Sequence, residues 1–146
     1  MKLFTVMIVI LFSFSLFAHE GHGEMPTESS KYGGVMGNVV SESKMMKKEK
    51  NNPPLMKAEI VRSDDGMVRL YLYDLKMNLL TDKDFLKDAQ GILENNKAKT
   101  KDQFSLTLHG NHYMGKIPKQ KRRPFNIYIS FSKGPEKLFV GFDNLD

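Results

Sequence analysis

The chain has 146 residues, with 22 Lys and Arg against 17 Asp and Glu, a net charge of +5, four His and no Cys. This length fits a single domain. The lack of Cys excludes disulfides, thiolate metal sites, a thiol nucleophile and the lipid-modified cysteine of a bacterial lipoprotein. The domain must therefore depend on its hydrophobic core for stability, and any soft metal ligand must be a methionine.

Residues 1–18 have the pattern of a secretory signal peptide. Lys2 provides a positive start, residues 3–17 are almost all apolar, and Ala18 is a small residue suited to cleavage. An uncleaved membrane anchor is the alternative, but a spanning helix needs about 20 apolar residues and this run is shorter. We therefore predict a periplasmic or secreted protein without a stable membrane span after cleavage.

The motif that follows the leader begins at His19 and ends at His22, with Glu and Gly between them. Cleavage after Ala18 would leave His19 as the first residue, so that its α-amine and imidazole could together chelate Cu(II). His22 offers a further imidazole, a ligand type that suits copper and zinc. A solvated tail whose histidines have no function is the alternative.

Residues 19–55 are predicted to be a flexible tail and linker, because Pro and Gly recur and core-forming residues are few. Within this segment, residues 32–40 could pair as an edge strand. Methionines are frequent here, and they could either bind Cu(I) or pack on the domain; they are Met25, Met36, Met45, Met46 and Met56.

From residue 56 onward the sequence predicts a domain of short strands. Residues 57–62 and 67–74 read as strands joined by an Asp-Gly turn, with Val68, Leu70 and Leu72 on one face. Residues 80–89 are predicted to form one or two helical turns, capped by Thr81. Residues 92–94 read as a weak strand.

Residues 103–113 predict a hairpin around a two-residue Gly-Asn turn. Phe104, Leu106 and Leu108 would face the core. His109 and His112 would then lie directly opposite each other on the solvent face, with Cβ atoms about 4.5–5.5 Å apart. Two imidazoles so placed can bind one metal ion, and Met114 would share the face of His112. A solvent-exposed pair of rings without a ligand role is the alternative.

The rest of the chain contains a basic loop and two more strands. Residues 116–123 carry five Lys and Arg, which could meet an acidic partner or simply be solvated. Alternating apolar residues then predict strands over 125–132 and 137–142. Six or seven short strands with turns between them favour an all-β, immunoglobulin-like β-sandwich over residues 56–146.

The leader and three short motifs resemble a known group of proteins. The leader, the His-Glu-Gly-His tail, residues 31–35 (Lys-Tyr-Gly-Gly-Val) and residues 70–74 (Leu-Tyr-Leu-Tyr-Asp) resemble small periplasmic proteins associated with bacterial heavy-metal and copper efflux systems. Those proteins have a β-sandwich and a His where this chain has Tyr32. The terminal His is also similar to that of periplasmic copper carriers with an immunoglobulin-like sandwich. The resemblance implies copper binding and an efflux component as partner.

Together these features predict an exported metal-binding protein of periplasmic metal homeostasis or efflux. The metal would be copper, or else zinc or another divalent transition metal, held by His19, His22, His109, His112 and Met114. No enzyme is expected, because no nucleophile lies in a catalytic pattern, and export argues against nucleic acid as a partner. The alternative function is a metal-free exported interaction module that binds a protein or envelope partner through its basic loop or through Tyr71 and Tyr73.

Overall fold

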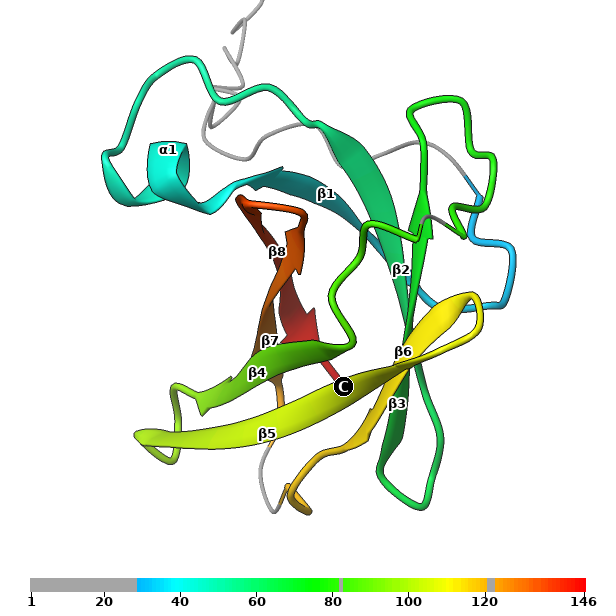
Figure 1. The fold of residues 1–146 in the computed structure, drawn as a ribbon. Coiled ribbons are helices and arrows are strands. Elements are labelled where there is room, and N and C mark those ends of the chain that lie inside the picture. Colours follow the sequence, from blue (N-terminus) through cyan, green and yellow to red (C-terminus); the bar gives the residue numbers. More distant parts are fainter. Residues whose placement is uncertain (1–28, 82, 121–122) are drawn as a thin grey trace, which may run out of the picture.

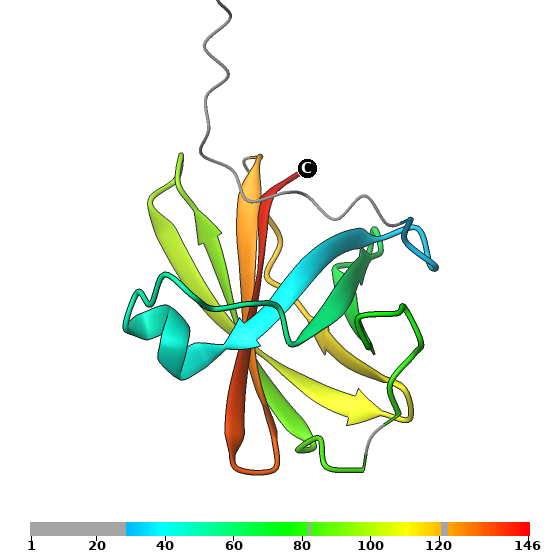
Figure 2. The same ribbon diagram turned by 90° about the horizontal axis from the view of Figure 1, so that it is seen from above.

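The computed structural model describes residues 29–81, 83–120 and 123–146 as an all-β fold (Figure 1). One short helix, α1 (Glu42–Met46), lies outside the strands beside the end of β1 (Figure 2). The strands are β1 (Val35–Ser41), β2 (Met56–Arg62), β3 (Met67–Tyr73), β4 (Asp88–Asn95), β5 (Thr100–His109), β6 (His112–Lys116), β7 (Phe125–Lys133) and β8 (Glu136–Leu145).

The eight strands form one closed antiparallel barrel in the order β1-β2-β3-β6-β5-β4-β7-β8. Two connections join strands that are not neighbours. Residues 74–87 lead from β3 to β4, and residues 117–124 lead from β6 to β7. The second connection contains Lys119 and Arg123 of the predicted basic loop, so the topology places these two residues at one end of the barrel.

The alternation of apolar residues predicted the core residues correctly, although it was assigned to a sandwich. Over residues 68–72, 104–108, 125–131 and 138–142, every second residue points inward, as the period of a strand requires. The predicted core residues Val68, Leu70, Leu72, Phe104, Leu106, Phe125, Ile127, Ile129, Phe131, Leu138, Val140 and Phe142 are buried, and Leu108 is partly buried against them.

The all-β prediction is confirmed, but the immunoglobulin-like sandwich is not. A sandwich needs two separate sheets, whereas here a single sheet closes on itself. Closure comes from β1, in which Val40 and Ser41 pair with Phe139 and Leu138 of β8. Because β1 also pairs with β2 through Val35 to Val39, it lies between two strands and is not the predicted edge strand.

The folded domain also begins earlier than residue 56. Residues 35–41 form β1 although they lie in the segment predicted as a linker, and Val39 is fully buried. The predicted signal peptide over residues 1–18 lies outside the described residues. In the ranges that the structure describes, no helix is long and apolar enough to cross a membrane.

The helix predicted over residues 80–89 is wrong, since the described residues of this segment contain no helix. Asp88 and Ala89 instead pair with β5 as the start of β4. The backbone N–H of Leu86 donates to the carbonyl of Ser132 at 2.9 Å, a bond that a helix would not allow. Phe85 is buried with its ring 6.0 Å from that of Phe131, so it anchors the segment to the core.

Candidate functional site

The hairpin of β5 and β6 places two histidines side by side. His109 pairs directly with His112 across the strands, as the sequence predicted. Gly110 opens the turn with φ at +63°, in the left-handed region that the first position of a primed two-residue turn requires. Both imidazoles are on the outer face, because their neighbours Leu108 and Tyr113 point into the barrel.

His112 is the more enclosed member of this pair. Its ring centroid lies 5.0 Å from that of Tyr71, and its Nδ1 is 3.0 Å from Oδ1 of Asn111. Burial lowers the pKa of His112, and the nearby positive charges of Arg69 and His109 lower it further. A lowered pKa keeps the imidazole neutral, the form in which it can bind a metal ion.

Met114 shares the outer face with His112, two residues further along β6. It pairs with Thr107 of β5 and with Arg69 of β3, and it is partly buried. The structure therefore places His109, His112 and Met114, three of the five predicted ligands, on the outer face of one hairpin. His19 and His22 lie outside the described residues. Within the described ranges, no group of three or more His, Cys, Asp or Glu side chains could hold a metal ion.

Two tyrosines extend the row of rings from His112 across the barrel surface. Tyr71 stacks on Tyr32, with ring centroids 4.0 Å apart and planes 19° apart. Tyr32 is 47% exposed. The metal-free alternative used Tyr71 and Tyr73 to bind a partner. Tyr73, however, is fully buried and cannot contact a partner. The ring of Tyr32 thus packs on Tyr71, which in turn lies beside His112.

Residues 31–34, which we call the N-terminal strap, are held by the buried carboxylate of Glu59. Its Oε1 accepts hydrogen bonds from the backbone N–H groups of Tyr32 (2.9 Å) and Gly34 (2.7 Å). Its Oε2 accepts from the backbone N–H of Lys31 (2.9 Å) and from the hydroxyl of Tyr73 (2.8 Å). The strap thus fixes Tyr32 over Tyr71.

Gly34 allows the strap to approach this closely. A Cβ atom at residue 34 would lie 2.3 Å from the carbonyl oxygen of Ile60, which is backbone and cannot rotate away. The pattern Gly33-Gly34 in the sequence therefore has a structural reason in this chain. Glu59 was missed as a residue of interest, because a charged residue at an outward strand position usually indicates a solvated surface.

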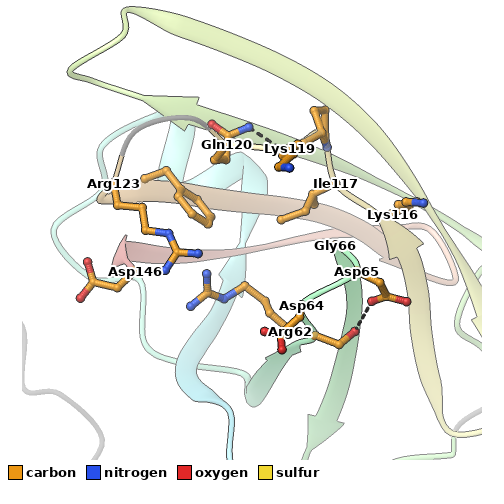
Figure 3. Close-up of a pocket in the computed structure, with 13 residues that line it drawn as sticks. Arg62, Asp64, Asp65, Gly66, Lys116, Ile117, Lys119, Gln120, Arg123 and Asp146 are labelled. Atoms are coloured by element: carbon orange, nitrogen blue, oxygen red, sulfur yellow. Dashed lines mark hydrogen bonds between the residues drawn. The ribbon is translucent and has the colours of Figure 1, made fainter.

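A second group of polar residues lies at the opposite end of β6. The hairpin turn after β2, residues 116–120 and Arg123 line a cavity of about 610 Å³ (Figure 3). Arg62, Lys116, Lys119 and Arg123 line it, together with Asp64, Asp65 and Asp146. The sequence indicated the basic segment but gave no signal that Arg62 would join it.

No protein-family model matches the chain, and the comparisons with curated proteins and with solved structures give no match either.

Proposed function

We propose that this protein is an exported transition-metal-binding protein, with copper as its cargo, that serves periplasmic metal homeostasis or efflux. The cross-strand pair of His109 and His112 carries the proposal. Both rings come from neighbouring positions on paired strands, so they can approach one ion without a change in the backbone. Imidazole nitrogen is a good ligand for copper and zinc, and a thioether such as that of Met114 suits Cu(I).

The proposed site also uses the N-terminal tail. Two imidazoles and a thioether leave room on the ion for further ligands, and the α-amine and imidazole of His19 and the imidazole of His22 would supply them. Export through the predicted signal peptide is part of the proposal, because cleavage after Ala18 creates that α-amine. An efflux component is the proposed partner, and its support is the resemblance of the sequence motifs alone.

Copper retention tests the proposal. The mature protein, beginning at His19, is equilibrated with Cu(II), desalted and assayed for bound metal. We expect the double variant His109→Ala/His112→Ala to lose the hairpin contribution and to retain copper only through the tail. Adding one residue before His19 should have the opposite effect, because it removes the terminal chelate and leaves the hairpin intact.

Gln103→Ala is the matched control for the hairpin variant. Gln103 is exposed on the same strand as His109 and has no ligand role in the proposal. It should retain copper like the unmodified protein. If the unmodified protein retains no copper, or if neither the hairpin variant nor the extended tail changes retention, the metal proposal fails. The metal-free interaction module then becomes the better account.

Acidification should weaken metal binding at the hairpin only at a lower pH than it would at an ordinary imidazole. The pKa of His112 lies below its usual value of about 6.5, so protons displace the metal from this ring only at a lower pH. An NMR titration of the metal-free protein should give a His112 midpoint below 6.5. Arg69→Gln should raise that midpoint, because it removes a positive charge that disfavours the imidazolium. A midpoint at or above the usual value would contradict the expected neutral ring.

A further inference from the structure

The cavity of about 610 Å³ at the end of the barrel has the size of a small-molecule site. It forms where β2 and β6 end and β7 begins, and residues 117–120 and Arg123 form one wall. Ile117 and Phe125 are buried and form its apolar part. This end of the barrel is distinct from the histidine hairpin, because His112 begins β6 and Lys116 ends it.

Two arginines approach each other in this cavity. Figure 3 shows the side chains of Arg62 and Arg123 turned toward one another. The guanidinium of Arg62 lies over the ring of Phe125, 5.2 Å from its centroid. Burial lowers the pKa of Arg62, the charge of Arg123 lowers it further, and Asp146 acts in the opposite direction. The two like charges therefore cost free energy in this arrangement.

The nearby carboxylates do not neutralise the two arginines by direct contact. Oδ1 of Asp65 accepts hydrogen bonds from the hydroxyl of Ser63 (2.7 Å) and from the backbone N–H of Met67 (3.1 Å), so this carboxylate stabilises the turn. Among the described residues, neither guanidinium forms an ion pair with a carboxylate. Two guanidinium groups close together thus remain available for the oxygens of a bound anion.

We propose that this cavity binds a small organic anion that joins a phosphate or carboxylate group to an apolar body. Arg62 and Arg123 hold the anionic oxygens, since a planar guanidinium donates two parallel hydrogen bonds to such groups. The apolar body lies against Ile117 and Phe125. Lys116 and Lys119 at the rim attract the ligand by their charge. This site uses none of the residues of the proposed metal site.

Phenyl phosphate is the first probe, because it combines the two features in one molecule. Its binding to the mature protein is measured by isothermal titration calorimetry at low ionic strength. We expect Arg123→Gln and Arg62→Gln each to weaken binding about tenfold or more, as the loss of a charge-assisted hydrogen bond implies. Arg123 is exposed, so its variant keeps the test valid if Arg62→Gln proves unstable in a thermal melt.

Lys137→Gln is the matched control. It removes one positive charge at the start of β8, whereas the cavity includes Asp146 beyond the end of that strand. Its affinity for phenyl phosphate should equal that of the unmodified protein. Arg123→Gln should also retain copper normally, so that failure of this proposal and failure of the metal proposal remain distinguishable.

Two more probes separate the sources of the anionic group. Tighter binding of phenylacetate than of phenyl phosphate assigns the cavity to carboxylates, and the reverse order assigns it to phosphates. Inorganic phosphate should bind more weakly than phenyl phosphate, because it lacks the apolar body. The proposal is overturned if neither aromatic probe binds at millimolar concentration, or if both arginine variants bind as tightly as the Lys137→Gln control.

Discussion

Glu59→Gln should lower the free energy of unfolding by about 2–4 kcal/mol, because two of its four donors lose their acceptor and the other two keep only a neutral one. Each carboxylate oxygen of Glu59 accepts two hydrogen bonds, and the residue is fully buried. A Gln side chain has one oxygen and one NH₂ group. Whichever way the amide turns, the NH₂ group meets donors that previously met an oxygen. Urea denaturation of the two proteins measures the difference.

The same variant should release the N-terminal strap. The backbone N–H groups of Lys31, Tyr32 and Gly34 are all bound to Glu59, and their release would free Tyr32 from its position over Tyr71. Trypsin should then cleave after Lys31 faster in Glu59→Gln than in the unmodified protein, because local opening exposes the backbone. Cleavage at an unchanged rate would show that the strap is held by other contacts.

Glu94→Gln provides the control for this change. Glu94 forms a surface ion pair with Lys101, at 3.0 Å, and the lysine side chain is 70% exposed. Exposed pairs of this kind contribute about 0–1 kcal/mol. A loss on Glu94→Gln as large as that on Glu59→Gln would contradict the structural role assigned to the buried carboxylate.

Acid should remove the advantage of Glu59. Burial raises its pKa, but the hydrogen bonds from Gly34, Tyr73, Tyr32 and Lys31 outweigh burial and hold the pKa below its usual value. A lowered folded-state pKa contributes stability that is present above the unfolded-state value of about 4.3 and is lost as pH falls through the folded value. The difference in stability between the unmodified protein and Glu59→Gln should therefore narrow below about pH 4.3.

Local periodicity explains how much of the fold could be predicted. Alternation identified which residues of β3, β5, β7 and β8 face the core, because the period of two is a property of each strand alone. Barrel closure, in contrast, cannot be predicted from the pattern of a single strand. It depends on pairing between residues 40–41 and 138–139, which lie far apart in the chain, so the local pattern of β1 could suggest a strand but not its place between two other strands.

In the candidate sites too, local pattern could place some residues, whereas others come together only in the complete fold. His109 and His112 could be placed opposite each other, because the Gly-Asn turn between them fixes the register locally. Arg62 and Arg123 belong to different strand ends, and only the complete barrel brings them together. Glu59 carries no local signal either, since its four donors come from the strap and from β3.

Leu93→Ala should lower the free energy of unfolding by about 2–5 kcal/mol, through lost burial and the cavity it leaves. Leu93 is fully buried in β4, whereas its neighbour Ile92 is 40% exposed on the outer face. Ile92→Ala removes a similar aliphatic group from the same strand and should cost less than about 1 kcal/mol, since little apolar surface leaves the core. Equal losses in urea denaturation would mean that β4 does not present Leu93 to the barrel interior, and the registers of β4 with β5 and β7 would both be wrong.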